Sequence, residues 1–197
     1  IKADVLKQRD IDPVKDELRA IRPYKALFDK SYASNIDGPN VKSGTRWEMT
    51  EQLREDIRSF KAENGCERVV VIWIASTEKF IKRNDEVHGS VAAFEAAMKA
   101  DDKANVAPSM CYAYAAMREG CPFVMGAPNL CVDIPAMWEL AEETKTPITG
   151  KDFKSGQTMM KTVLAPAFFT RQLGVTGWFS TNILGNRDGI VLDNPEN

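Results

Sequence analysis

Residues 68–76, Arg-Val-Val-Val-Ile-Trp-Ile-Ala-Ser, are the stretch that most limits how this chain can fold. β-Branched and aromatic side chains follow one another there without polar alternation, which is typical of a strand buried on both faces of a parallel sheet. Two parallel strands need a crossover connection between them, usually a helix. The stretch therefore predicts an α/β fold.

The sequence on both sides of this strand alternates helical and strand-like patterns, as an α/β fold requires. Thr45 or Ser43 can cap the helix that precedes the strand, and Gly65 can end it. Asp12 is a plausible N-cap of an earlier helix, with Pro13 at its first position. Helices are predicted over residues 46–64, 90–100, 107–120 and 134–144, and further strands over 121–127 and 146–150.

The pattern changes after residue 150. One long apolar helix is predicted over residues 156–174, where Pro166 should kink the helix or join two pieces, and a strand over 175–185. We therefore expect two units, residues 1–150 and residues 151–197.

Charge and length exclude several classes of protein. The net charge is −2 and the pI about 5.6, so no global positive field favours nucleic acid or an anionic membrane. No apolar stretch approaches the roughly 20 residues of a membrane helix. A folded domain with a locally built ligand site is the expectation.

The cysteines and the single histidine give weak chemical signals. Cys111 and Cys121 lie in apolar segments, as buried free thiols do, and this favours a reduced, cytoplasmic setting, although four cysteines also allow disulfides. His88 lies in a polar loop and is expected to be solvated. Zinc-ligand spacing, a P-loop, a G-x-S-x-G elbow and an intact G-x-G-x-x-G turn are all missing from the sequence, and a metal requirement stays unknown.

Three loops are expected at the carboxyl ends of the strands, where ligands bind in open α/β sheets. These loops are residues 74–80, 125–129 and 150–158. Gly126 and Gly150 would let a backbone or a cofactor approach closely. Each loop alone is as well explained by turns and helix caps, so their shared position is the stronger signal.

The segment Lys154-Ser155-Gly156-Gln157-Thr158 allows two interpretations. Ser155 as N-cap, with Thr158 in the first turn, could satisfy the local amides. Capping needs neither Lys154 nor the bare Gly156, whereas a bound oxyanion would use lysine charge and first-turn N–H groups. Asn182, Asn186, Arg187 and Asp188 form a second polar cluster, which is also good turn chemistry.

In chain order, several motifs resemble those of the inositol-3-phosphate synthase (myo-inositol-1-phosphate synthase) family, in the form of its bacterial and archaeal branch. They are IRPYK (21–25), VVVIWIASTEKF (69–80), PFVMGAPN (122–129), GKDFKSGQTMMKTVLAP (150–166) and STNILGNRDG (180–189). The last two motifs are the specific ones.

The resemblance implies part of a Rossmann-like parallel sheet with flanking helices, leading into the start of an α+β catalytic and oligomerisation domain. It implies an NAD-dependent isomerase of inositol and phospholipid biosynthesis that converts D-glucose 6-phosphate to 1D-myo-inositol 3-phosphate. Oxidation at C5, enolisation, aldol closure and return of the hydride make up that reaction. It further implies a homotetramer that binds a small phosphorylated sugar. Whether a cation assists the reaction is unknown.

The resemblance also assigns residues by position. Substrate-binding positions are Ser155, Gly156, Gln157, Thr158 and Asn182, and candidate catalytic positions are Asp152 and Lys154. Cofactor-binding positions are Ile74, Ala75, Ser76, Thr77, Gly126, Asp152, Ser155, Asn186, Arg187 and Asp188. Ile74 and Ser76 depart from the family's usual Thr-Ala-Asn-Thr, and Arg187 matches by position only.

The family's glycine-rich turn and its principal lysines are expected outside residues 1–197, so we expect a central fragment that is inactive alone. Lys154 and Lys161 are nearby cations, but their positions alone do not assign them the catalytic role of those lysines. Two alternatives stay open: another NAD-dependent oxidoreductase of a phosphorylated metabolite, and a non-catalytic phosphate-binding or assembly module.

Overall fold

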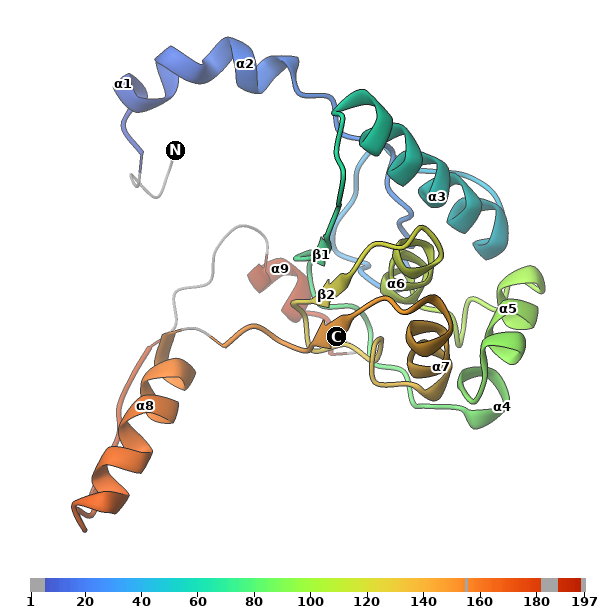
Figure 1. Ribbon diagram of the computed structural model, residues 1–197. Helices are drawn as coiled ribbons and strands as arrows, with labels where there is room; N and C mark the ends of the chain where they lie inside the picture. Colours follow the sequence, from blue (N-terminus) through green and yellow to red (C-terminus); the bar gives the residue numbers. More distant parts are fainter. Residues whose placement is uncertain (1–5, 155, 182–187, 196–197) are drawn as a thin grey trace.

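The computed structural model describes residues 6–154, 156–181 and 188–195 (Figure 1). Its sheet has three strands, β1 (Val71–Trp73), β2 (Phe123–Met125) and β3 (Ile148–Gly150). They are parallel and follow the order β1-β2-β3, with Phe123 paired to Val71 on one side and to Ile148 on the other. This arrangement confirms the predicted α/β fold.

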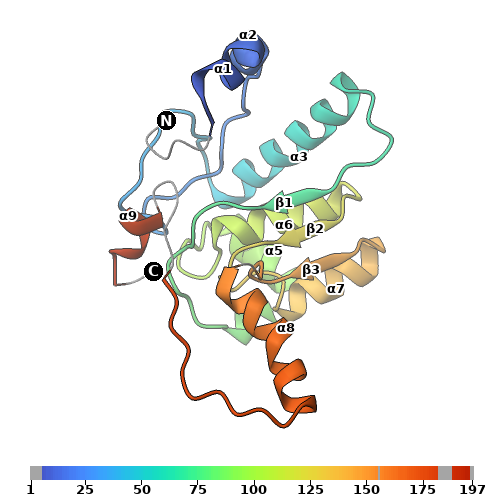
Figure 2. The same ribbon diagram turned by 90° about the vertical axis from the view of Figure 1, so that its left-hand side faces the viewer.

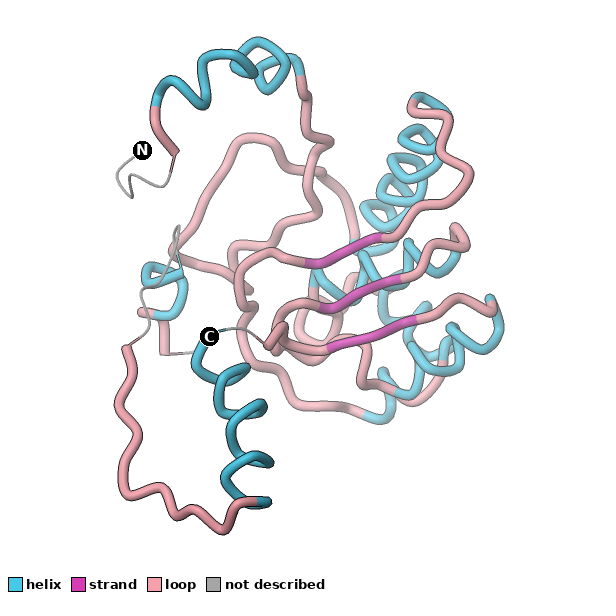
Figure 3. Tube along the Cα trace, turned by 60° about the vertical axis from the view of Figure 1, so that its left-hand side comes forward, coloured by secondary structure: helices cyan, strands magenta, loops and turns pink. Residues whose placement is uncertain are grey.

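The helical layer on one side of the sheet contains α3 (Arg46–Glu63), α6 (Pro108–Arg118) and α7 (Pro135–Thr144), and α5 (Val91–Lys99) packs on α3 and α7. Helix α6 packs on β1 and β2 and also contacts α3 and α7. Figure 2 shows this layer behind the strands, and Figure 3 shows the three strands side by side in front of it. The short α4 (Asp85–His88) precedes α5.

Helix α6 is the centre of the core. Its residues from Pro108 to Met117 are buried except Tyr112, which is half-buried. A helix that is apolar on all sides must be surrounded, and here the sheet, α3 and α7 surround it. The methionines fill the irregular spaces between these elements.

Capping confirms one predicted helix start and corrects another. The Thr45 hydroxyl accepts a hydrogen bond from the Glu48 amide, and the Glu48 carboxylate accepts one from the Thr45 amide, so Thr45 caps α3. Asp12 is not an N-cap. It has helical dihedral angles and begins the 3₁₀ turn η1 (Asp12–Val14) between α1 (Gln8–Ile11) and α2 (Lys15–Ala20).

The expectation that the first strand is buried on both faces was wrong. Ile72 is 53% exposed and Ile74 is 76% exposed. Within the described residues the helix layer lies on one face of the sheet, and β1 is an edge strand. The continuous apolar run therefore keeps one face open.

The segment after residue 150 differs from its prediction in two places. Helix α8 (Gly156–Thr170) continues through Pro166, so this proline does not join two pieces. Residues 175–181 are irregular rather than a strand, and 182–185 lie outside the described residues. Helix α8 projects away from the sheet with no buried side chain, and residues 171–181 return beside it (Figures 1 and 2).

His88 is buried, not solvated. Its Nδ1 accepts a hydrogen bond from the Asn84 amide at 3.0 Å, and its Nε2 lies 2.7 Å from the Asn105 carbonyl oxygen. Nδ1 must therefore be unprotonated and Nε2 protonated, so the ring is a neutral link between two loops. All four cysteines are free thiols, as expected for Cys111 and Cys121.

Candidate functional site

The three predicted ligand loops meet at the carboxyl edge of the sheet. The Gly126 amide donates to the Trp73 carbonyl at 2.9 Å, and the Phe153 amide donates to the Gly126 carbonyl at 3.0 Å. The Asp152 amide also donates to the Ala127 carbonyl at 3.2 Å. These bonds continue the parallel ladder beyond the strands and tie the three loops to one another.

A cavity of about 260 Å³ opens between these loops. Six of the predicted cofactor-binding residues line it together: Ile74, Ala75, Ser76, Thr77, Gly126 and Asp152. They come from positions up to 78 residues apart in the sequence and share one wall because parallel strands end at the same edge. The structure thus brings the central group of predicted residues to one place.

Ala127 and Pro128, from the predicted loop 125–129, also line the cavity, together with two residues that the sequence did not indicate, Val191 and Leu192. The last two belong to the short helix α9 (Asp188–Leu192), whose Val191 is buried. Asn35 Nδ2 donates to the Ile190 carbonyl at 2.8 Å, which ties α9 to a loop 155 residues earlier. A contact of that sequence separation leaves no local pattern by which it could have been found.

A second cavity, also of about 260 Å³, lies at the first turn of α8. Its lining contains Gly156, Gln157 and Thr158, together with Asp152, Phe153, Lys154 and Thr181. Lys154 Nζ lies 3.1 Å from Asp152 Oδ2, and both side chains are exposed. Asp152 lines both cavities and therefore lies between the predicted cofactor and substrate positions.

Four of the predicted site residues lie outside the part of the chain that the structure describes. These are Ser155, Asn182, Asn186 and Arg187, whereas Asp188 is the first residue of α9. Gln157 is held by a hydrogen bond from the Ser180 hydroxyl to its Oε1, and Ser180 Oγ accepts a hydrogen bond from Trp178 Nε1 at 3.0 Å. The segment 178–181 therefore lies over the first turn of α8.

The cavity at the sheet edge fits part of a dinucleotide. Ligand pockets span about 300–1,000 Å³, so about 260 Å³ suits one end of a dinucleotide. The small side chains of Ala75, Ser76 and Ala127, and the bare Gly126, let a flat ring and its ribose approach the backbone. The residues present therefore fit one end of NAD, and no group of three or more potential metal ligands occurs among the described residues.

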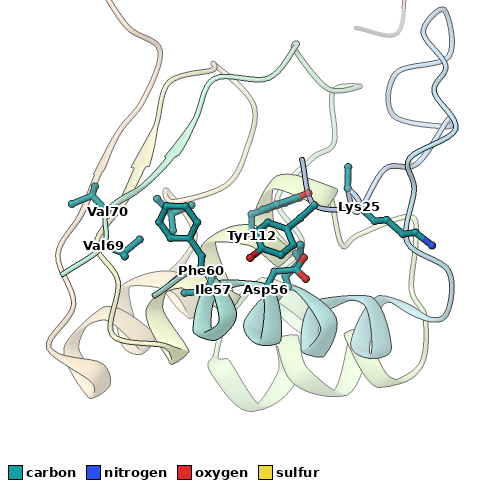
Figure 4. Close-up of a pocket in the computed structure, with 11 residues that line it drawn as sticks. Lys25, Asp56, Ile57, Phe60, Val69, Val70 and Tyr112 are labelled. Atoms are coloured by element: carbon teal, nitrogen blue, oxygen red, sulfur yellow. The ribbon is translucent and has the colours of Figure 1, made fainter. Parts of the chain in front are cut away.

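A larger cavity, of about 380 Å³, lies elsewhere (Figure 4). It is between α3 and the residues that lead into β1, and Ile57, Phe60, Val69 and Tyr112 line it. The lining is mostly apolar and lies at the amino end of β1, away from the three loops. Position relative to the sheet therefore excludes it as the predicted site.

Comparison with known proteins shows the family of the chain. The model of the NAD-binding domain of myo-inositol-1-phosphate synthase matches residues 1–193. An inositol-3-phosphate synthase 1 of Bacteroides thetaiotaomicron is 64% identical over 196 residues, which is 99% of this chain and 46% of that protein. The inositol-3-phosphate synthase of Drosophila melanogaster is 35% identical, over 99% of this chain and 35% of its own length.

The fold matches a solved structure as well. The crystal structure of inositol-3-phosphate synthase from Caenorhabditis elegans superposes with a TM-score of 0.81 at 29% identity. The match covers 86% of this chain and 34% of that one. The chain thus spans less than half the length of the curated relatives it matches. Among the described residues no helix is long and apolar enough to cross a membrane.

Proposed function

Because this chain belongs to the myo-inositol-1-phosphate synthase family, we propose that it forms the NAD-contacting and phosphate-contacting part of an enzyme. That enzyme converts D-glucose 6-phosphate to 1D-myo-inositol 3-phosphate in the synthesis of inositol and phospholipids. The convergence of residues 74–77, Gly126 and Asp152 on one cavity carries the proposal. In this proposal the cofactor and the sugar phosphate bind in two neighbouring cavities, and Asp152 lines both of them.

When bound, NAD supplies the hydride acceptor and later the hydride donor. The loops of residues 74–77 and 126–128 would hold one end of NAD at the sheet edge, and Val191 of α9, which is buried, would help to exclude water there. Asp152 faces both cavities and is placed to orient sugar hydroxyls toward the cofactor. The proposal assigns Ser155, Asn186, Arg187 and Asp188 to cofactor binding and Asn182 to sugar binding, on the family resemblance alone.

The phosphate of the sugar binds at the first turn of α8. The N-terminus of a fifteen-residue helix presents free N–H groups and the positive end of its dipole. Gly156 lets the phosphate approach the backbone, Thr158 and Gln157 offer side-chain hydrogen bonds, and Lys154 adds charge. The same lysine can stabilise negative charge that develops on the sugar oxygens.

The reaction gives the first test. Incubation of the full-length protein with glucose 6-phosphate and NAD⁺ should form inositol phosphate without net NADH, because the hydride returns to the product. Phosphorus NMR and absorbance at the NADH band measure the two quantities. Net NADH in proportion to substrate would instead favour an ordinary oxidoreductase, and failure to bind NAD would favour a non-catalytic module.

Removal of the Lys154 charge is the second test. Lys154→Ala in the full-length protein should weaken glucose 6-phosphate binding about ten- to a hundredfold. This loss corresponds to the contribution of a charge-assisted hydrogen bond, which is about 1.5–3 kcal/mol. Lys103→Ala is a matched control, because Lys103 also pairs with an aspartate two residues earlier at 3.1 Å but does not line the cavity. Equal affinities of both variants in calorimetric titration would argue against a phosphate site.

We also propose that residues 1–150 form part of the NAD-binding domain and that 151–197 begin a catalytic and oligomerisation domain. The exposed apolar side chains of α8 and the returning segment, among them Phe169, Leu173 and Phe179, support a second domain that covers them. Assembly as a homotetramer and a cytoplasmic location complete the proposal, and the four free thiols agree with the latter.

A further inference from the structure

Glu78 is a buried carboxylate directly after the loop that lines the cofactor cavity. It is 5% exposed, and the loop of residues 74–77 ends one residue before it. Glu78 Oε1 accepts a hydrogen bond from the Ser109 amide at 2.9 Å, and Oε2 accepts one from the Ser109 hydroxyl at 2.5 Å. Burial raises the pKa of this carboxyl, and the donated hydrogen bonds oppose that rise.

Asn129 holds the same carboxylate from the second loop. Its Nδ2 donates to Glu78 Oε2 at 2.9 Å, and its Oδ1 accepts a hydrogen bond from the Glu78 amide at 3.1 Å. Asn129 directly follows the lining residues 126–128, as Glu78 directly follows 74–77. The two loops are thus joined reciprocally just outside the cavity.

The third loop joins the same link. Lys151 Nζ lies 3.3 Å from the Asn129 carbonyl oxygen and 2.8 Å from Asp133 Oδ2. Burial alone would raise the pKa of Asp133, but Lys151 and backbone amides hold it below its ordinary value. Asn129 therefore contacts the residues that follow β1 and the residues that follow β3.

We propose that Glu78 and Asn129 are positioning residues that set the separation of the cofactor loops. Neither lines the cavity, so each acts through the residues that do. The Glu78 carboxylate accepts three hydrogen bonds, but its burial still costs desolvation free energy that burial of an apolar side chain would not. Stability alone therefore does not account for a carboxylate at this position. This inference rests on the proposed NAD site.

Two single substitutions break the link. In Glu78→Gln one carboxylate oxygen becomes an NH₂ group. In one orientation of the side chain this NH₂ faces the NH₂ of Asn129, and in the other it faces the Ser109 amide, so two donors oppose each other either way. In Asn129→Asp two carboxylates face each other at the present 2.9 Å contact. Each full-length variant should show a KM for NAD⁺ raised about tenfold or more, with kcat at saturating NAD⁺ retained.

The double substitution restores the link. In Glu78→Gln with Asn129→Asp, the new amide donates to the new carboxylate and to the Ser109 hydroxyl, while its oxygen still accepts from the Ser109 amide. The double variant should recover a KM for NAD⁺ within about threefold of the original, less than the effect of one lost hydrogen bond. Because the new amide and the new carboxylate face each other as donor and acceptor, the double variant should fold even if a single variant does not.

Kinetics are normalised to the folded fraction from circular dichroism, and Glu142→Gln, an exposed carboxylate on α7, is the control. A merely structural role would lower the folded fraction and leave the KM of folded molecules unchanged, which would overturn the inference. A double variant no better than the singles would also overturn it. Absence of NAD binding by the unsubstituted protein would instead reject the proposed function itself.

Discussion

Arg46→Ala is expected to lower the free energy of unfolding by about 3–5 kcal/mol, the cost of breaking a buried ion pair. Arg46 is 1% exposed, and its Nη2 lies 2.5 Å from Asp29 Oδ2. Its Nε donates to the Val106 carbonyl at 3.0 Å, and its guanidinium lies over the Tyr32 ring. Alanine would leave Asp29 without its charge partner and Val106 without its donor. Since domains are stable by about 5–15 kcal/mol, this loss is large.

Denaturant unfolding measures this effect, and Arg58→Ala on the same helix is the matched control. Arg58 pairs with Glu55 and Glu119 but is half exposed, so its loss should cost about 1 kcal/mol or less. Equal effects of the two substitutions would contradict the assignment of Arg46 as a buried anchor.

The pair also predicts a pH dependence. Burial would raise the pKa of Asp29, but hydrogen bonds from Ser31 and the Arg46 guanidinium bring it below its ordinary value. A lowered pKa means that this stabilisation is present above the ordinary carboxyl pKa and is lost as pH falls through the folded value. Arg46→Ala should therefore flatten the acid limb of the stability profile.

Gly126→Ala should weaken NAD binding about tenfold or more in the full-length protein, because the site has no room for a methyl group. A Cβ at this position would lie 2.6 Å from the Trp73 carbonyl oxygen and 2.8 Å from the Phe153 ring. The Trp73 oxygen is backbone, so relief requires the β1 and β2 loops to separate. Overpacking of this kind costs about 1–3 kcal/mol, which is of the order of a tenfold loss or more.

Titration with NAD⁺ measures this loss, and Gly38→Ala is the control. A Cβ at Gly38 would meet nothing within 4 Å, so that variant should bind NAD as the unsubstituted protein does. If Gly126→Ala retained full affinity, the cavity between these loops would not be the cofactor site.

Sequence reasoning predicted the three strands, the helices of the core and the ligand loops, because these depend on local properties. Apolar periodicity and capping residues placed α3, α5, α6 and α7, and of the two predicted caps of α3, Thr45 and Ser43, the structure has Thr45. The rule that parallel strands end together placed residues 74–77, Gly126 and Asp152 at one edge, and one cavity contains them.

Predictions that depended on distant neighbours were wrong or missing. The burial of His88 depends on the Asn105 carbonyl, and α9 reaches the cavity through a bond to Asn35. The open face of β1 depends on which elements lie beside it, although its sequence is that of a buried strand. A local pattern carries no information about partners so far along the chain.

By itself the sequence determined the α/β class, the family resemblance and the loops that carry small polar residues, because the chain's periodicity and turn chemistry act over a few residues. Only the tertiary structure decided that Glu78 and Asn129 join those loops, that Arg46 is a buried anchor, and that α9 covers the cavity. These features are pairings between residues far apart in the chain, and such pairings exist only once the chain has folded.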